Sequence, residues 1–149
     1  MSYTQLYYHI VIRTYRSRPT IKEEYERELY NYIYGMCKNR DVKLLRIGGM
    51  PDHIHLFVAL PLLLPVGRFV QVIKSVTSVW LKENPHFPDF VRWSKEYAAF
   101  TYSARDKQMI VNYIRNQKKH HKKVSFREEY RQFLLDNEVE IEEQFFLVD

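Results

Sequence analysis

The spacing of hydrophobic residues changes in a fixed order along the chain, and this order limits the folds that the chain can form. Between residues 3 and 15, hydrophobic side chains alternate with the period of two that is typical of a β-strand. Between residues 21 and 36 they recur every three or four positions, as on one face of an amphipathic helix. The strand pattern returns at 42–47, 53–60 and 93–103, and the helical pattern returns at 66–80 and 110–117.

This order of elements predicts a βαββαβ unit followed by further helices. We expect an α+β fold of the ferredoxin-like kind, in which helices cover one face of an antiparallel sheet and C-terminal helices are appended. All 149 residues are expected to form one domain, with residues 124–149 as a C-terminal extension.

Local signals set the expected limits of these elements. Thr20–Glu23 and Ser125–Glu128 match the capping box, which predicts that a helix begins at each of them. Gly48–Asp52 is rich in turn residues and predicts the turn of a hairpin between the second and third strands. A helix is expected to begin near Asp106 and to continue through the basic residues up to Lys123.

Composition excludes several classes of protein. Hydrophobic residues make up 46% of the chain, which is too many for a disordered protein, and no apolar run is long enough to cross a bilayer. The first residues lack the basic and apolar regions of a signal peptide, and Cys37 is the only cysteine, so no intramolecular disulfide can form. We therefore expect a soluble cytoplasmic protein without membrane contacts.

Charge is distributed unevenly near the end of the chain. Residues 104–131 hold nine Lys and Arg against three Asp and Glu, whereas residues 132–149 hold six acidic residues and no Lys or Arg. A basic segment beside an acidic tail indicates a surface that binds a polyanion, although a solvated helical face would give the same pattern. Aromatic residues reach 15% of the chain, and aromatic rings among basic side chains suit single-stranded nucleic acid.

Two histidines in the third expected strand can bind a metal ion. His53 and His55 are two positions apart, so a strand places both imidazoles on one face and turns Ile54 toward the other. Neutral imidazole nitrogens are good ligands for divalent ions. Two ligands are too few for a catalytic centre, so a third has to come from elsewhere in the fold.

The helix expected after Asp106 offers both a further ligand and a nucleophile. Tyr113 and Gln117 are four residues apart and therefore lie on the same helical face. The amide oxygen of Gln117 could complete the metal shell, and the phenol of Tyr113 could attack a phosphate held there. A phenol has an ordinary pKa of about 10, so it needs activation near neutral pH. Taken alone, a tyrosine at this position is more often a packed aromatic residue of the helix than a nucleophile.

Taken together, these motifs resemble the single-tyrosine HUH transposases of small bacterial insertion sequences and their REP-associated relatives. The resemblance rests on four segments in the family's order: Tyr8–Val11, Pro51–Leu56, Trp93–Ser103 and Tyr113–Gln117. The segment from His120 to Glu129 is similar to an extension of the REP-associated branch. One departure is Ala104, because a glycine is common there and would ease the turn into the tyrosine helix.

The resemblance implies a mechanism and assigns roles to individual residues. His53, His55 and Gln117 would bind Mg²⁺ or Mn²⁺, and Tyr113 would form a 5′-phosphotyrosine and release a 3′-OH. Transesterification conserves the bond energy, so no nucleotide cofactor is needed. The implied partners are single-stranded DNA carrying hairpins and a second copy of the chain, since the family is commonly dimeric.

Contacts with the DNA backbone are expected from the basic helix and, less directly, from the second helix. The candidate residues are Arg115, Lys118, Lys119, His120, Lys122, Lys123, Lys74 and Arg68. For His120 and His121 we expect DNA contact or surface exposure rather than metal binding, because Gln117 already fits the third ligand position. His9 and His86 are expected to be structural.

Three functions fit these features. The first is an active transposase of a mobile element, and the second is a domesticated REP-associated nuclease with a host role and the same chemistry. The third is a ferredoxin-like nucleic-acid-binding module without catalysis. The acidic tail could dock on the basic helix or pack as a terminal strand, and its apolar end, Phe145–Val148, favours packing.

Overall fold

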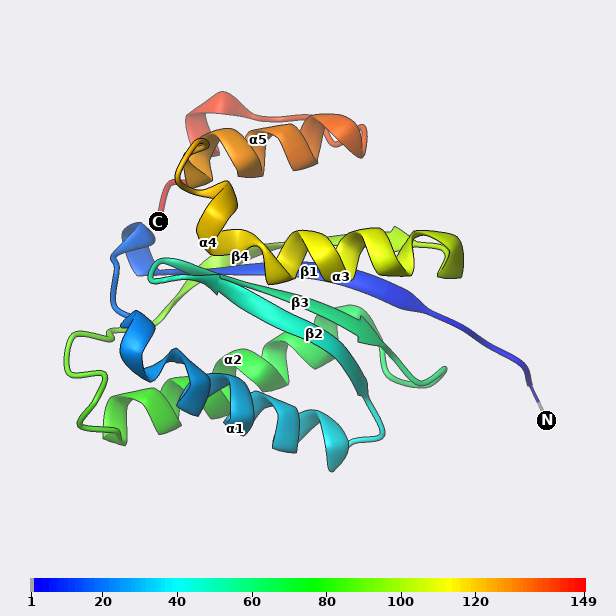
Figure 1. The fold of residues 1–149 in the computed structure, drawn as a ribbon, viewed down its shortest axis with the longest axis horizontal. Helices are drawn as coiled ribbons and strands as arrows, with labels where there is room; N and C mark the ends of the chain where they lie inside the picture. The colour runs from blue at the N-terminus through cyan, green and yellow to red at the C-terminus, as the bar shows by residue number, and fades with distance from the viewer. Residues whose placement is uncertain (1) are drawn as a thin grey trace.

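The computed structural model describes residues 2–149 and consists of a four-stranded antiparallel sheet between two layers of helices (Figure 1). The strands are β1 (Tyr7–Thr14), β2 (Lys43–Met50), β3 (His53–Ala59) and β4 (Trp93–Tyr102). The helices are α1 (Glu26–Lys38), α2 (Val66–Glu83), α3 (Lys107–Arg115), α4 (Gln117–His120) and α5 (Phe126–Asp136). Short 3-10 turns lie at Tyr15–Ser17, Glu23–Tyr25, Ala104–Asp106 and Glu143–Phe145.

The strand order confirms the predicted ferredoxin-like βαββαβ unit. The order in the sheet is β2-β3-β1-β4, and all three neighbouring pairs are antiparallel. The first and third strands therefore lie in the centre, and β2 and β4 form the edges. None of the helices that residues 2–149 form is both long and apolar enough to cross a bilayer.

The main hydrophobic core lies between the sheet and the layer of α1 and α2. Ile54, Leu56 and Val58 of β3 point into it and are fully buried. They pack with Ile10 and Ile12 of β1 and with hydrophobic residues of both helices. The helical residues in this core are Leu29, Ile33, Met36, Phe69, Val70, Ile73 and Leu81.

The C-terminal helices cover the opposite face of the sheet. Ile110 and Ile114 of α3 pack on Tyr7 and Phe57 in one cluster. In a second cluster, Phe126 and Tyr130 of α5 pack with Phe146 on residues of β1 and β4. Figure 1 shows α3, α4 and α5 on one side of the sheet and α1 and α2 on the other, so both faces of the sheet are covered.

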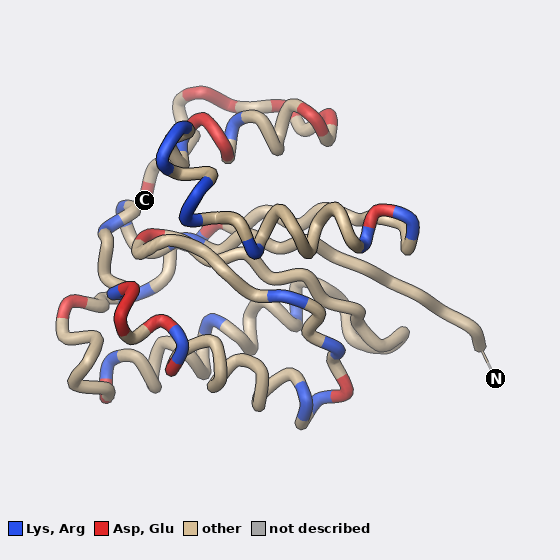
Figure 2. Tube along the Cα trace, viewed as in Figure 1, with Lys and Arg blue, Asp and Glu red and all other residues tan. Residues whose placement is uncertain are grey.

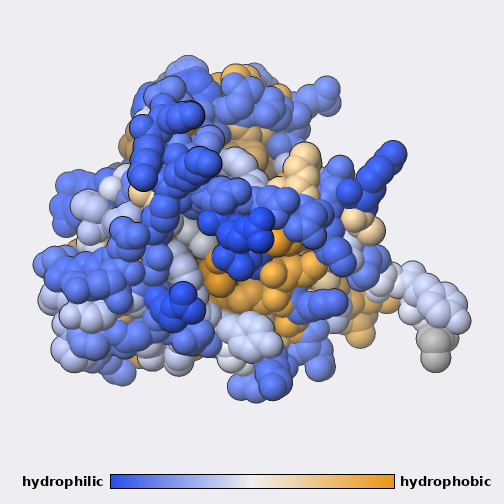
Figure 3. Space-filling view, viewed as in Figure 1, coloured by the Kyte–Doolittle hydropathy of each residue, from blue (hydrophilic) through white to orange (hydrophobic). Residues whose placement is uncertain are grey.

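Edge strand β2 is covered only in part. Leu44, Leu45 and Ile47 are half-buried, in contrast to the fully buried side chains of β3. In the space-filling view, a hydrophobic patch is visible beside this strand, between α1 and α3, while hydrophilic residues cover most of the rest of this face (Figure 3).

Two of the predicted helix limits differ from the structure. The capping box at Thr20 is wrong: the backbone of Ile21 donates a hydrogen bond to Pro51 O, Lys22 is extended, and α1 begins only at Glu26. The helix expected from Asp106 to Lys123 is broken at Asn116, which separates α3 from α4. The second capping box is confirmed, since the Ser125 hydroxyl accepts a hydrogen bond from the backbone of Glu128.

The acidic tail packs against the molecule but does not form a strand. It contains a 3-10 turn at Glu143–Phe145, and Phe146 is buried against Tyr130 of α5. The expectation of packing is therefore confirmed, and the expectation of a terminal strand is wrong.

The hairpin between β2 and β3 is tighter than predicted. Gly48 and Gly49 pair with His55 and Ile54 inside the sheet, and only Pro51 and Asp52 form the turn. Both glycines are required by close packing. A Cβ atom on Gly48 would lie 2.8 Å from Ile114 O, and one on Gly49 would lie 2.2 Å from His53 O. The absence of a Cβ atom on Gly48 lets the end of α3 approach the sheet beside the two histidines, and its absence on Gly49 lets the hairpin close against β3.

Substitution of Gly49 tests this packing. We expect Gly49→Ala to lower the free energy of unfolding by about 2–3 kcal/mol, because the new methyl group overlaps the backbone of β3. Gly35→Ala is the matched control: nothing lies within 4 Å of its Cβ position in α1, and alanine favours helix by up to about 1 kcal/mol. Urea denaturation measures the free energy of unfolding of both variants. A Gly49→Ala protein as stable as wild type would contradict the packing.

The tail is also held by a buried ion pair at the far end of β1. Arg13 is 2% exposed, and its guanidinium lies 2.8 Å from a carboxylate oxygen of Asp149. The Ser94 hydroxyl and the backbone of Arg16 also donate to this carboxylate. Burial raises the pKa of Asp149, but the hydrogen bonds from Ser94, Arg16 and Arg13 outweigh it and hold the pKa below its usual value.

Asp149→Asn is expected to reduce the free energy of unfolding by about 1.5–3 kcal/mol at pH 7, since it removes a charged hydrogen-bond acceptor. The pKa of Asp149 is lower in the folded state than in the unfolded state, so its ionised carboxylate stabilises the fold above pH about 4. This stabilisation is lost as the pH falls further. The difference from wild type should therefore shrink in urea denaturation at pH 3. The control is exposed Asp89→Asn. An equal difference at both pH values would show that the ion pair is not the cause.

Candidate active site

Alternation in β3 places His53 and His55 on the face of the sheet that α3, α4 and α5 cover. Both side chains are fully buried, and they point away from the aliphatic core that Ile54 and Leu56 enter. Their neighbours across the sheet are Arg13 and Val11 on one side and Met50 and Gly48 on the other. Buried imidazoles need polar partners, because an unpaired polar group in a protein interior is costly.

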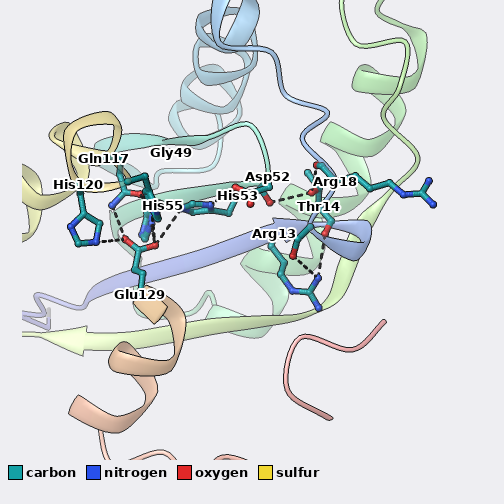
Figure 4. Close-up of polar contacts among 12 residues, drawn as sticks. Arg13, Thr14, Arg18, Gly49, Asp52, His53, His55, Gln117, His120 and Glu129 are labelled. Carbon is teal, nitrogen blue, oxygen red and sulfur yellow. Dashed lines mark hydrogen bonds and ion pairs between the residues drawn. The ribbon is translucent and has the colours of Figure 1, made fainter. Parts of the chain in front are cut away.

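Each of these histidines has a partner at Nδ1 that fixes its ring. Nδ1 of His53 lies 2.7 Å from Oδ1 of Asp52, and Nδ1 of His55 lies 2.8 Å from Nε2 of His9. The rings of His9 and His55 are stacked, with their centroids 5.1 Å apart. The Nε2 atoms of His53 and His55 both face the Glu129 side chain (Figure 4). An Nδ1 hydrogen bond that orients the ring is typical of metal-binding histidines.

Tyr113 and Gln117 remain together although the helix is broken between them. Oε1 of Gln117 lies 3.2 Å from Nε2 of His53. The ring of Tyr113, on α3, meets the ring of His55 edge-on with centroids 5.8 Å apart. The structure thus brings together the four residues that the sequence selected for metal binding and attack: His53, His55, Tyr113 and Gln117.

A further residue of the cluster, Glu129 of α5, was not selected from the sequence. Its carboxylate is buried, and Oε1 lies 3.3 Å from Nε2 of His53 and 3.2 Å from Nε2 of His55. Oε2 accepts hydrogen bonds from the Gln117 amide and the Tyr113 hydroxyl. The signal in the sequence was slight: Glu129 follows Glu128 in the first turn of α5, where acidic residues are common in any helix.

The remaining histidines differ in how they relate to the cluster. His121 was expected at the surface or on DNA, but its side chain is 5% exposed and its Nε2 lies 3.0 Å from Gln117 Oε1. His120 is partly exposed and meets the Tyr113 ring edge-on. His9 belongs to the cluster through its bond to His55, which fits its expected structural role. His86 is far away, stacked on Tyr25.

Electrostatics of the cluster keep Glu129 charged and Tyr113 protonated. Burial raises the pKa of Glu129, but hydrogen bonds from His121, His53 and His55 outweigh it and hold the pKa well below its usual range. Burial raises the pKa of Tyr113, and the neighbouring Glu129 charge raises it further. Tyr113 in this arrangement is a neutral phenol, so attack on phosphorus requires additional positive charge nearby.

The histidine rings respond to the same neighbours in different ways. Burial lowers the pKa of His55 and lowers the pKa of His9 strongly. Burial also acts to lower the pKa of His53, but hydrogen bonds from its ring to the Asp52 and Glu129 carboxylates outweigh it and leave the pKa above its usual value.

The donor atoms are close enough to bind one metal ion. One atom each of His53, His55 and Glu129 lie within 4.8 Å of one another. A second group with this property consists of His120, His121 and Glu129. Imidazole nitrogen and carboxylate oxygen are suitable ligands for divalent ions, and an amide oxygen, as in Gln117, is a common addition. The residues present therefore fit a divalent metal.

Basic side chains near Tyr113 line a groove of about 470 Å³. Lys119, Lys123 and His120 border it together with Tyr113. Figure 2 shows positively charged residues along α4 and the segment that follows it, where exposed Lys122 also lies. A second cavity on the α5 side of Tyr113 is lined by Glu128, Glu129 and Phe133.

The other basic candidates lie elsewhere. Arg115 and Lys118 line a separate cavity next to Gln117, and Lys118 is bound to Glu26 and to Gly49 O. Lys74 and Arg68 lie on α2, on the opposite side of the sheet from Tyr113. Nζ of Lys74 donates to the Ser94 carbonyl at 2.8 Å. The structure does not bring these two α2 residues to the cluster.

Comparison with known proteins identifies a family and structures with a similar fold. The family model described as transposase IS200 like matches residues 2–117. Among solved structures, a candidate transposase from Deinococcus radiodurans R1 is similar with 23% identity and a TM-score of 0.58, covering 78% of this chain and 93% of that chain. No curated protein matches the chain.

A second similar structure is a REP-associated tyrosine transposase bound to a REP hairpin. It is 16% identical, has a TM-score of 0.57, and is matched over 83% of this chain and 73% of its own. At these identities the two structures establish the shared fold. The family match ends at Gln117, so α5 and Glu129 lie outside it.

Proposed function

The chain belongs to the IS200-like transposase family, and we propose that it cleaves and rejoins single-stranded DNA through a 5′-phosphotyrosine on Tyr113. One observation supports this most strongly. The Tyr113 hydroxyl shares the carboxylate of Glu129 with the Gln117 amide, and the imidazoles of His53 and His55 face the same carboxylate. A phenol beside metal-binding side chains is what attack on a phosphodiester requires.

In this proposal His53, His55 and Gln117 hold a divalent ion, Mg²⁺ or Mn²⁺. The ion, when bound, polarises the scissile phosphate and stabilises negative charge on its oxygens. The chain's own residues orient the reactants. Asp52 and His9 fix the two imidazole rings, and α3 presents the Tyr113 hydroxyl beside them.

The reaction is two transesterifications in series. The Tyr113 oxygen forms a bond to phosphorus and loses its proton, while the bond from phosphorus to the 3′ oxygen breaks and that oxygen takes up a proton. Later a DNA 3′-OH attacks the phosphotyrosine, the strand is resealed, and the phenol is restored. The number of phosphoester bonds is unchanged, so no nucleotide cofactor is needed.

The groove beside Tyr113 is the proposed path of the DNA strand. Lys119 and Lys123 border it and would contact the backbone, and His120 lies against the Tyr113 ring. The hairpin in the similar REP-associated structure supports recognition of hairpin DNA by this chain. A homodimer is also proposed, and the partly covered hydrophobic residues of β2 are available to a second copy.

Two other functions would use the same structure. A domesticated REP-associated nuclease would carry out the same chemistry in a host role, and only the DNA around its gene distinguishes it from an active transposase. A binding module without catalysis predicts instead that Tyr113 is dispensable.

A covalent adduct is the direct test of the chemistry. Wild-type protein mixed with hairpin-containing single-stranded DNA from its own element and Mn²⁺ should give a DNA-linked band on a denaturing gel. Tyr113→Phe should give none, because it lacks the attacking oxygen. Tyr102→Phe is the matched control, since the Tyr102 ring lies beside His9 at the edge of the cluster and has no proposed role. An adduct formed by Tyr113→Phe would contradict the assignment, and the absence of one in wild type would contradict catalysis.

Salt dependence tests the proposed strand path. Each phosphate contact to single-stranded DNA contributes about 0.7 to the slope of log affinity against log salt concentration. The double variant Lys119→Ala/Lys123→Ala should therefore make this negative slope shallower by about 1.4, as measured by fluorescence anisotropy. Lys38→Ala/Lys82→Ala removes the same charge from exposed sites at the ends of α1 and α2 and should leave the slope unchanged. Equal slopes for both double variants would contradict the path.

A further inference from the structure

Helix α5 directs Glu129 into the cluster and holds it there with aromatic side chains. Phe126, three residues earlier, stacks on His53 with ring centroids 4.0 Å apart. Phe133, four residues later, meets His9 edge-on at 5.0 Å and stacks on Phe100 at 5.7 Å. These contacts hold the helix on the sheet with the Glu129 side chain, which is 2% exposed, directed into the cluster. Burying a charged carboxylate is costly unless positive charge compensates it.

Nε2 of His53 faces two oxygen atoms inside the cluster. Nδ1 of His53 faces the Asp52 carboxylate, so Nδ1 carries the ring proton of the neutral imidazole. Nε2 then carries a lone pair, yet it faces Gln117 Oε1 at 3.2 Å and Glu129 Oε1 at 3.3 Å. Both of these oxygens are acceptors. A neutral ring in this position would place lone pairs against lone pairs.

His121 has the same pattern of partners. Its Nδ1 lies 2.8 Å from the Val124 carbonyl oxygen, which can only accept, and its Nε2 faces the same two oxygens at 3.0 and 3.2 Å. His55 adds a third Nε2, 3.2 Å from Glu129 Oε1. Three imidazole nitrogens and two acceptor oxygens thus face each other, an arrangement that either ring protons or a bound metal ion can satisfy.

The separations match the edges of a metal coordination shell. Ligand bonds of about 2.1 Å put neighbouring donor atoms about 3.0–3.4 Å apart in octahedral or tetrahedral geometry. The pairs His53–Gln117, His53–Glu129 and His55–Glu129 have separations of 3.2, 3.3 and 3.2 Å between their donor atoms. These three separations therefore have the size expected between neighbouring ligands of one ion.

We propose that Glu129 is a ligand of the metal ion, so that the C-terminal extension completes the metal centre with a carboxylate. This inference rests on the proposed metal-dependent function, and it adds an anionic ligand to the His53, His55 and Gln117 set. A carboxylate oxygen strengthens binding of a hard ion such as Mn²⁺ or Mg²⁺ more than imidazole nitrogens do. The second oxygen of Glu129 accepts from the Tyr113 hydroxyl, so the same side chain positions the phenol beside the metal.

Calorimetric titration of the metal-free full chain with MnCl₂ tests the proposal. Wild type should bind one Mn²⁺ in this cluster, and Glu129→Gln should bind it about 10- to 100-fold more weakly, because it loses the charged ligand while keeping size and hydrogen bonding. Glu128→Gln is the matched control: it makes the same charge change one residue away, on an exposed side chain. It should bind Mn²⁺ within about twofold of wild type.

A second readout uses the melting temperature, which a bound metal raises. Saturating Mn²⁺ should raise it for wild type and Glu128→Gln, and much less for Glu129→Gln. If the glutamine variant does not fold in EDTA, Glu129→Asp is used in its place. This substitution keeps the charge but draws the carboxylate back from the histidines, so about a tenfold loss of Mn²⁺ affinity is again expected. If a folded Glu129 variant binds Mn²⁺ as tightly as wild type does, the proposal is overturned.

The outcomes separate this inference from the proposed function. Unchanged Mn²⁺ affinity in Glu129→Gln, together with a Tyr113-dependent adduct in wild type, overturns the role of Glu129 and leaves the nuclease proposal intact. Loss of adduct formation in Glu129→Gln without any loss of Mn²⁺ affinity also overturns metal ligation. No Mn²⁺ binding by wild type overturns both.

Discussion

Strand alternation in β3 divides the molecule into an aliphatic side and a polar side. Ile54, Leu56 and Val58 close the core over α1 and α2, and the residues between them, His53 and His55, are forced onto the opposite face. Buried imidazoles on a sheet cannot be left without partners. The second layer, from α3 to α5, is therefore both a cover for the sheet and the source of the groups that the histidines need.

That second layer depends on close approach at a few points. Gly48 lies opposite His55 and admits the end of α3, which brings Tyr113 and Gln117 to the cluster. Phe126 and Phe133 then hold α5 over the histidines, with Glu129 between them. Asp149 ties the following tail to Arg13 at the end of β1. The helices that cover this face of the sheet therefore also carry the side chains of the candidate site.

The fold and the central site residues follow from the sequence because they depend on local periodicity. The period of two in β3 predicts that His53 and His55 share a face, and the spacing of four predicts that Tyr113 and Gln117 do. Sheet order follows from the succession of elements. The break at Asn116 was not predicted, and the pairing of residues 113 and 117 survives it because both side chains reach the same histidines.

Glu129 and His121 could not be predicted because their positions depend on tertiary packing. Glu129 is one of two neighbouring acidic residues, and only the docking of α5 decides which of them is buried. His121 belongs to a basic segment that reads as exposed, yet the turn after α4 buries its ring against Gln117. The start of α1 was mispredicted for a similar reason, since the backbone of Ile21 bonds to the distant Pro51.

The central claim is that a metal ion and the Tyr113 phenol share one cluster of side chains. Anomalous X-ray scattering from crystals soaked in MnCl₂ tests this most directly. We expect a single strong manganese peak about 2–2.5 Å from Nε2 of His53, Nε2 of His55, Oε1 of Gln117 and a carboxylate oxygen of Glu129. A manganese peak away from His53 and His55, or none at these residues, would contradict the claim.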